Sequence, residues 1–236
     1  MKSQSALNNI INEIKESANK EKAKSLQRFF KTGLGEYGEG DIFIGLNNFD
    51  QKIIARKFCN LSLKDLESLL KNKIHECRST ALSILIDQYQ KGDGIKKEKI
   101  FNLYLRNIKY INNWDLVDIS SYKIVGNYLL DKPRNLLYQL SESKDVWARR
   151  ISIISTFEFI RHNEFKDTLK IARILVNDEH DLIHKAVGWM LREIGKRNLI
   201  QEEKFLDKYH RLMPRTMLRY AIERFGKDKR VYYMKK

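Results

Sequence analysis

The sequence predicts an all-α fold, an α-solenoid built from stacked helical hairpins. Residues that break helices are scarce: the chain of 236 residues has 2 prolines and 11 glycines, and five of the glycines are clustered between Gly33 and Gly45. Outside that cluster apolar residues recur at helical spacing, and no segment shows the sustained alternation of a strand. Hairpins bury their apolar faces by stacking, and the loose period of roughly 33–40 residues lies within the range of HEAT-type arrays. The alternative is a single globular helical bundle.

The expected helices follow one another along the chain. The first, within residues 5–19, places Ile10 and Ile14 on one face. Ser62 followed by Asp65 has the form of a capping box, so a helix is expected to begin there. Further helices are expected at 75–91, 100–111, 114–130, 133–140, 146–162, 165–176, 182–197, 202–212 and 215–225. Two of these begin beside the prolines, which suits the fixed φ of that residue at a helix start.

The charge of the chain points to a polyanionic partner. It has 45 Lys+Arg against 30 Asp+Glu, a formal net charge of +15. Nucleic acid is the first expectation and an anionic membrane the second. The excess is spread along the chain, which favours a long basic surface over a local membrane anchor. A cytosolic protein that is merely rich in lysine is the alternative.

Several features place the protein in the cytoplasm. No run approaches the ~18 apolar residues that span a bilayer, and the N-terminal segment lacks the apolar core of a signal peptide. The two cysteines, Cys59 and Cys77, provide no disulfide framework. We expect both to be core residues.

The segment Gly33–Gly38 matches the pattern GxGxxG of dinucleotide-binding loops. That fingerprint requires a strand before it and a helix that begins on its glycines, whereas the preceding residues 24–32 have helical character. Glu36, Glu39 and Asp41 would also repel a pyrophosphate. We interpret the segment as a flexible loop between helices, able to lie near a ligand or a DNA backbone.

A second motif, His180–His184, resembles the zinc motif HExxH with Asp181 in place of glutamate. Two histidines at i and i+4 could share a metal. However, aspartate is one methylene shorter than the usual base, and no third ligand is evident. We therefore expect no metal and no cofactor.

The three tryptophans are more informative, because each shares a helix face with a charged residue three or four positions away. Any one of them could be a half-buried core residue with a charge at its rim. Their recurrence in successive repeats favours a shared concave surface on which cations hold phosphates and rings contact sugars or bases. The groups are Trp114 with Asp118, Trp147 with Arg150, and Trp189 with Lys185 and Arg192.

Five segments together resemble the AlkD family of bacterial DNA alkylation-repair proteins. They are NNWDLVD at 112–118, WARR at 147–150, KAVGWMLRE at 185–193, the loop KTGLGEYGEGDIFIG at 31–45, and MPRTMLRYAIER at 213–224. The resemblance extends roughly from Phe29 to Phe225. The chain departs from the family at Leu34, where the loop commonly has proline, and at Phe30, where some relatives have tyrosine.

The resemblance implies a single domain, 1–236, of HEAT-like repeats with a basic concave face. It implies a monomeric DNA glycosylase that acts on duplex DNA containing bases alkylated at ring nitrogens, chiefly 3-methyladenine and 7-methylguanine. Trp114 and Asp118 correspond to the catalytic aromatic and acid, and Arg150 to the active-site arginine. The expected DNA-binding residues are Trp189, Lys185, Arg192 and Arg149.

These assignments make chemical sense. A base alkylated at a ring nitrogen is cationic and leaves as a neutral molecule, so the difficulty moves to the sugar, which develops oxocarbenium character. A carboxylate such as Asp118 stabilises that charge, and Trp114 can place its electron-rich face against the cationic nucleotide. Asp115, about 100° around the helix from Trp114, is expected to stabilise the helix N-terminus.

Two rival hypotheses remain open. A catalytically silent helical-repeat protein could bind damaged or branched DNA, but binding alone gains nothing from the acid. A HEAT-type scaffold for other proteins would need no aromatic–acid pair. No motif provides a lysine nucleophile, so a glycosylase of this kind would be monofunctional and would not cleave the strand.

Overall fold

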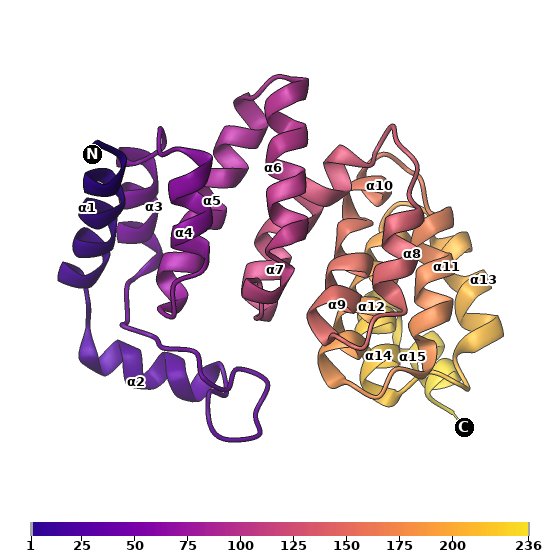
Figure 1. The fold of residues 1–236 in the computed structure, drawn as a ribbon. Helices are drawn as coiled ribbons and strands as arrows, with labels where there is room; N and C mark the ends of the chain where they lie inside the picture. Colours follow the sequence, from indigo (N-terminus) through magenta and orange to yellow (C-terminus); the bar gives the residue numbers. More distant parts are fainter. Residues whose placement is uncertain (1, 236) are drawn as a thin grey trace. The chain divides into compact units, whose positions relative to one another are not determined.

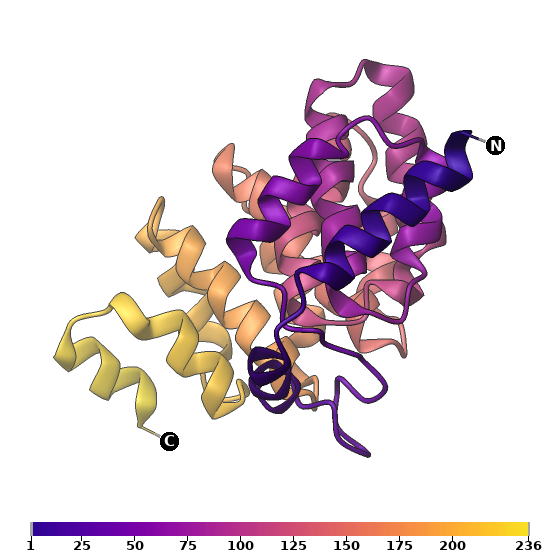
Figure 2. The same ribbon diagram turned by 90° about the vertical axis from the view of Figure 1, so that its left-hand side faces the viewer.

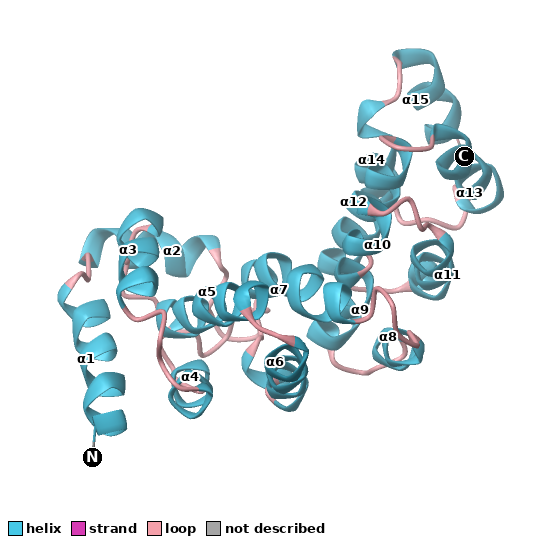
Figure 3. Ribbon diagram, turned by 90° about the horizontal axis from the view of Figure 1, so that it is seen from above, coloured by secondary structure: helices cyan, strands magenta, loops and turns pink. Residues whose placement is uncertain are grey.

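The computed structural model describes the backbone of residues 2–235 and the side chains of residues 6–235. Most of the described residues are helical, and most helices are joined by short turns (Figure 3). The exception is the long loop between Phe29 and Asn48. In residues 2–235 the β structure amounts to one isolated parallel bridge between Ile42 and Ile74. The all-α class predicted from the sequence is therefore confirmed. By packing, the chain divides into two compact units, Met1–Leu116 and Val117–Lys236.

The first unit is built around α5 (Figure 1). Its helices are α1 (Lys2–Glu16), α2 (Lys20–Phe29), α3 (Asn48–Lys57), α4 (Leu63–Leu70), α5 (His75–Lys91) and α6 (Gly94–Arg106), followed by the 3₁₀ turn η1 (Ile108–Tyr110). Both α3 and α4 pack against α5, and α1 packs against α3 and α4. The core takes Ile10 and Ile14 from α1, as predicted.

The cap that the Ser62/Asp65 motif predicts at the start of α4 is present. The backbone N–H of Asp65 donates to the Ser62 hydroxyl at 3.1 Å, and that hydroxyl donates to the Asp65 carboxylate at 2.7 Å. Leu66, Leu69 and Leu70 of α4 are fully buried, because this apolar stripe faces α5. The cap thus fixes both the start and the rotation of the helix.

The second unit is organised by α12 (Asp181–Gly195), which packs against α9 (Val146–Ser155), α13 (Leu199–Tyr209) and α14 (Arg215–Ala221). The other elements are α8 (Asn135–Ser141), α10 (Phe157–Arg161), α11 (Lys166–Ile174), η3 (Leu175–Asn177), η4 (Ile222–Arg224) and α15 (Lys227–Met234). Ile183, Val187 and Met190 of α12 are buried. The turns of α13, α14 and α15 are seen most openly in Figure 2.

The helix α7 (Trp114–Ser121) contains the boundary between the units. It continues into a π-helical turn, η2 (Tyr122–Gly126), where the sequence predicted uninterrupted α-helix over 114–130. Gly126 allows the chain to approach α9 closely, since a Cβ there would lie 2.2 Å from the Ser155 carbonyl oxygen. Such π turns occur frequently at functional sites.

The prediction that both prolines open helices is wrong for one of them. Pro214 immediately precedes the first residue of α14, but α8 begins at Asn135, two residues after Pro133. Arg134 intervenes, and its guanidinium donates to the carbonyls of Leu129 and Leu130, which holds the preceding turn closed. No helix among the described residues is long and apolar enough to cross a membrane.

Candidate active site

In the first unit, the indole of Trp114 packs in an aromatic group that local sequence did not indicate. It stacks on Phe30, with ring centroids 5.2 Å apart and planes 19° from parallel, and its edge contacts Phe29 at 6.0 Å. The indole N–H donates to the Tyr37 hydroxyl at 3.3 Å. The backbone N–H of Trp114 donates to the Asn113 side chain at 2.8 Å. Stacking and hydrogen bonding together fix the ring.

Tyr37 comes from the glycine-rich loop between α2 and α3, which protrudes from the end of α2 (Figures 1 and 2). The loop was expected to be flexible, but hydrogen bonds fasten it internally. The carboxylates of Glu36 and Glu39 accept from the backbone N–H groups of Gly33 and Gly35, each at 2.9 Å. Gly38 packs on the end of α2, where a Cβ would lie 2.5 Å from the Phe30 carbonyl oxygen.

The same loop carries the GxGxxG pattern of dinucleotide-binding motifs at Gly33–Gly38. It follows a helix, α2, and the next helix begins only at Asn48. The strand and the glycine-initiated helix of that fingerprint are therefore missing at this place. Asp41, one of the three carboxylates expected to repel a pyrophosphate, is buried, with 6% of its surface exposed.

Asp41 belongs to a buried ionic network that reaches α7. Its carboxylate accepts from the guanidinium of Arg78 at 2.6 Å and from the side chain of Asn113 at 3.2 Å. The imidazole of His75 lies between two carboxylates: its Nδ1 is 3.2 Å from Asp41, and its Nε2 is 2.8 Å from Asp115. Asp115 lies in the first turn of α7, as expected for charge at a helix N-terminus. It also ties that turn to α5.

The network sets the ionisation of its members. Burial disfavours the imidazolium of His75, but the hydrogen bonds to Asp115 and Asp41 outweigh burial and raise its pKa above the ordinary 6.5. Burial likewise disfavours the Asp41 carboxylate, yet the His75 hydrogen bond and the charge of Arg78 lower its pKa. Both shifts therefore favour the charged forms of His75 and Asp41.

In the second unit, Asp118 and Arg150 form a two-point ion pair. The Arg150 Nε donates to one carboxylate oxygen at 2.9 Å, and Nη2 donates to the other at 2.7 Å. Nη1 donates to the carbonyl of Leu182 at the start of α12. Arg150 is buried, whereas the Asp118 side chain keeps 17% of its surface exposed. The guanidinium therefore presents the carboxylate in one fixed orientation.

A second aromatic group lies beside α12. Trp189 contacts Phe157 at 5.9 Å between centroids, and Phe157 contacts Tyr122 of the π turn edge-on at 5.2 Å. The indole N–H of Trp189 donates to Glu193 at 3.1 Å.

The two cations predicted beside Trp189 lie on the same helix and form ion pairs at its surface. Lys185 pairs with Asp181 at 2.7 Å, and Arg192 pairs with Glu223. Lys185 keeps 39% of its side chain exposed and Arg192 17%. Neither pair is deeply buried, so a phosphate could compete for these cations.

Two predicted members of the surface are placed differently. Trp147 is buried, with 7% of its surface exposed, so its expected place on an open aromatic surface is wrong. It lies at the start of α9, which packs against both α8 and α12 and is buried along most of its length. Arg149 pairs with Asp178 at 2.6 Å and donates to the Ser143 carbonyl at 2.9 Å, so its guanidinium already has partners within the protein.

The histidine motif has a local structural role. His180 caps α12 by accepting from the Leu182 N–H at 3.2 Å, and the His184 ring contacts the Asp178 carbonyl. A search of the described residues finds no group of three His, Cys, Asp or Glu side chains arranged to hold a metal. Of the cysteines, Cys77 is buried and Cys59 is partly exposed.

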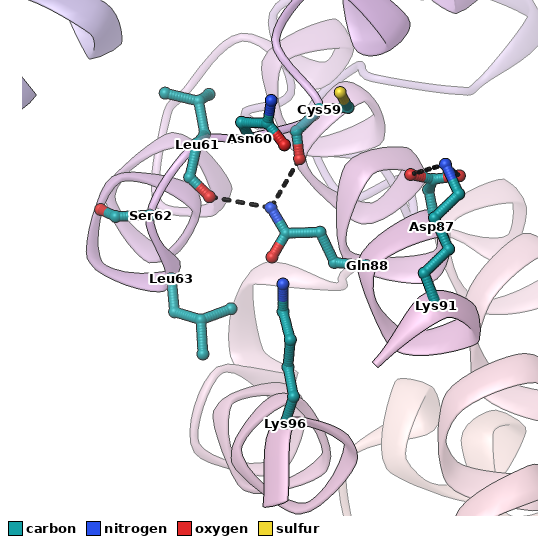
Figure 4. Close-up of a pocket in the computed structure, with 9 residues that line it drawn as sticks. All are labelled: Cys59, Asn60, Leu61, Ser62, Leu63, Asp87, Gln88, Lys91 and Lys96. Atoms are coloured by element: carbon teal, nitrogen blue, oxygen red, sulfur yellow. Dashed lines mark hydrogen bonds and ion pairs between the residues drawn. The ribbon is translucent and has the colours of Figure 1, made fainter. Parts of the chain in front are cut away.

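A surface cavity of the first unit lies apart from these residues. It is lined by Ser62 and Leu63 at the start of α4, by Gln88 and Lys91 of α5 and by Lys96 of α6, among others (Figure 4). The Gln88 amide donates to the backbone carbonyls of Cys59 and Leu61 at 2.8 Å each, and these bonds hold the loop between α3 and α4. None of the predicted site residues lines this cavity.

Comparison with known proteins gives two positive results. A family model described as "DNA alkylation repair enzyme" matches residues 10–225. A solved structure described as a predicted DNA alkylation repair enzyme from Enterococcus faecalis superposes with a TM-score of 0.71 and 16% identity, over 89% of this chain and 98% of that one. At that identity the likeness concerns the fold, and it agrees with an α-solenoid of helical repeats. A search of curated proteins found no match. Because the family model spans most of the sequence, the chain belongs to the family of DNA alkylation repair enzymes.

Proposed function

We propose that the protein is a monofunctional DNA glycosylase that hydrolyses the N-glycosidic bond of cationic N-alkylated purines in duplex DNA. Family membership supports a role in alkylation repair. The observation that carries the finer proposal is the Asp118 carboxylate, held at two points by Arg150 and partly exposed, one helical turn after Trp114 on α7. In this proposal the enzyme acts as a cytoplasmic monomer, and its substrates are 3-methyladenine and 7-methylguanine in DNA.

The proposed chemistry uses Asp118 against the sugar. As the bond to the base lengthens, positive charge develops on the sugar, and a preoriented carboxylate stabilises it without reorganisation. The Asp118 carboxylate is also proposed to accept a hydrogen bond from the water that attacks the sugar and so to orient it. Arg150 acts by holding Asp118, and its charge offsets part of the repulsion between the carboxylate and DNA phosphates.

Trp114 is proposed to contact the cationic nucleotide. Phe30 stacks on one face of the Trp114 ring and restricts its motion. A cation over the other face would gain about 0.5–2 kcal/mol, depending on desolvation. Asp118 follows Trp114 by four positions on α7, which is the spacing of residues on one helix face.

DNA binding is proposed to use α12. Trp189 would provide an aromatic contact, while Lys185 and Arg192 would exchange their carboxylate partners for phosphates. Arg149, already tied to Asp178 and to backbone carbonyls, would contribute less to DNA binding than the sequence suggests.

The experiment is release of methylated bases from alkylated duplex DNA under single-turnover conditions. Asp118→Asn should slow excision by on the order of 100- to 1,000-fold, the scale for loss of one preorganised electrostatic group. DNA affinity should be equal or slightly higher. Asp131→Asn, which changes an exposed carboxylate, is the matched control. If the parent protein binds the DNA and releases no base, the silent DNA-binding hypothesis replaces this one.

A further inference from the structure

A continuous ring stack connects α7 to α5 within the first unit. Trp114 stacks on Phe30, Phe30 stacks on Phe43 at 4.8 Å, and Phe43 stacks on His75 at 4.3 Å. His75 then returns to α7 through its 2.8 Å contact with Asp115. Asp115, the residue after Trp114, is thus hydrogen-bonded to His75, the last ring of the stack that begins with Trp114.

We propose that His75 is a positioning residue, which sets the orientation of the Trp114 ring by bridging Asp41 of the loop to Asp115 of α7. The consequence for base excision rests on the function proposed above. The orientation itself is a property of the free protein. It can therefore be measured without any DNA.

The bridge requires both ring nitrogens of His75 to donate. Only the imidazolium has two N–H groups, whereas the neutral ring has one donor and one acceptor. A neutral ring would therefore turn a lone pair towards one of the two aspartates. Within the described residues, the Asp115 carboxylate has no hydrogen bond other than that from His75, and its buried Oδ1 is unpartnered. Loss of this bond would leave a carboxylate that is poorly satisfied.

The groups around the imidazole favour the bridged state. Asp41 from the loop and Asp115 from α7 are both anionic partners, and Phe30 and Phe43 cover the ring. Arg78 from α5 opposes the charge, because its Nη2 lies 3.4 Å from Nδ1. That same atom is only 2.6 Å from Asp41, however, so the guanidinium is already committed to a carboxylate.

The sign of the pH effect follows. The folded protein holds the His75 proton more tightly than the unfolded chain. The bridge is therefore complete at and below the ordinary pKa of 6.5 and is lost as pH rises through the higher folded value. The Trp114 ring should lose its fixed orientation over the same interval of pH.

The first measurement is nuclear magnetic resonance of the free protein. The indole N–H signal of Trp114, identified by its absence in Trp114→Phe, should shift as pH is raised from about 6.5, the ordinary pKa of histidine, to more alkaline values. His75→Gln should abolish that shift. His162→Gln, which changes a histidine of the second unit, should leave it unchanged. An indole signal that ignores pH, or one that titrates equally in His75→Gln, would overturn the proposal.

The second measurement is excision of 7-methylguanine over the same pH range. The parent rate should fall on the order of ten- to 100-fold towards high pH, the scale for a misplaced catalytic group. DNA affinity should change little. His75→Gln should be slow and nearly independent of pH. Excision with a flat parent profile would refute the link to catalysis, whereas no excision at any pH with a titrating indole would refute the proposed function and support the positioning role.

A second variant covers the case in which His75→Gln does not fold. Tyr37→Phe removes only the hydroxyl that accepts from the Trp114 indole. It should move the indole signal at every pH and slow excision while leaving the titration by His75 in place. Tyr232→Phe, at an exposed tyrosine, is the control. An indole signal unmoved in Tyr37→Phe would contradict the loop's part in positioning Trp114.

Discussion

Arg150 grips the Asp118 carboxylate through two hydrogen bonds, of 2.9 and 2.7 Å, while only 4% of the arginine surface is exposed. The guanidinium is buried, and its Nε, Nη1 and Nη2 atoms already donate to Asp118 and to the Leu182 carbonyl. It is therefore poorly placed to bind a phosphate as well. Its contribution to repair should therefore pass through Asp118. This distinguishes it from Lys185 and Arg192 of α12, whose side chains are partly exposed.

Replacing Arg150 with lysine tests that role. Lysine keeps the charge but cannot form the planar two-point contact, so excision should fall about tenfold or more. The log–log salt dependence of DNA binding should not change, because no phosphate contact is lost. Lysine is preferred to alanine, since removing one partner of a buried pair costs about 3–5 kcal/mol of stability. Arg161→Lys, at a half-exposed ion pair, is the control, and a reduced salt slope in Arg150→Lys would contradict the assignment.

Lys185 and Arg192 should behave in the opposite way. Each phosphate neutralised contributes about −0.9 to the slope of log affinity against log salt. Lys185→Ala and Arg192→Ala should therefore each reduce the magnitude of the slope by about one. Lys91→Ala is the matched control, because Lys91 also pairs with an aspartate one turn away, Asp87. Slopes equal to the parent in both α12 variants would remove these residues from the DNA interface.

Local signals in the sequence predicted most of the helices, but α3 and α15 were not among them. The cap at Ser62 could be predicted because it depends on residues three positions apart. The partners of Trp114 could not, since Tyr37 is 77 positions away and no periodicity records the contact. Likewise the bridge from His75 to Asp115 spans 40 positions.

The error at Trp147 has a related cause. A charged residue one turn away suggested an open face, but Arg150 is itself buried against Asp118. Helical spacing tells which residues share a face, and it does not tell whether that face meets solvent or another helix. Pairing between distant helices decided this case.

Glu202 of α13 should make the stability of the second unit depend on pH. Only 2% of its surface is exposed, its Oε1 has no partner, and burial, followed by the nearby charge of Glu203, raises its pKa to about 8. The folded protein therefore retains this proton above the ordinary pKa of 4.5, whereas the unfolded chain loses it. Stability should consequently fall as pH rises from about 4.5 to about 8 and then level off.

Denaturant unfolding over that range would measure the effect. Glu202→Gln should flatten the slope by the equivalent of one proton and should be the more stable protein at the alkaline end. Glu142→Gln, at an exposed carboxylate of α8's end, should keep the parent slope. A Glu202→Gln profile parallel to that of the parent would mean that the carboxyl ionises without penalty in the folded state.

The charge of the substrate provides the most demanding test of the proposed mechanism. If excision depends on a carboxylate and an aromatic face, with no acid to protonate the departing base, only bases with a formal positive charge should be removed. The structure adds one hydroxyl to this environment, because Tyr37 lies 3.3 Å from the Trp114 indole, but a tyrosine hydroxyl is a weak acid at neutral pH. The two ring nitrogens of His75 already contact Asp41 and Asp115, so neither is placed to protonate a base.

Duplexes with a single 3-methyladenine or 7-methylguanine should therefore be substrates under single-turnover conditions at neutral pH, and duplexes with hypoxanthine, ethenoadenine or uracil should not. Comparable rates on hypoxanthine and 7-methylguanine would require an acid at the site. Tyr37→Phe would then show whether that acid is Tyr37, since its hydroxyl would be needed for hypoxanthine and dispensable as a proton donor for 7-methylguanine.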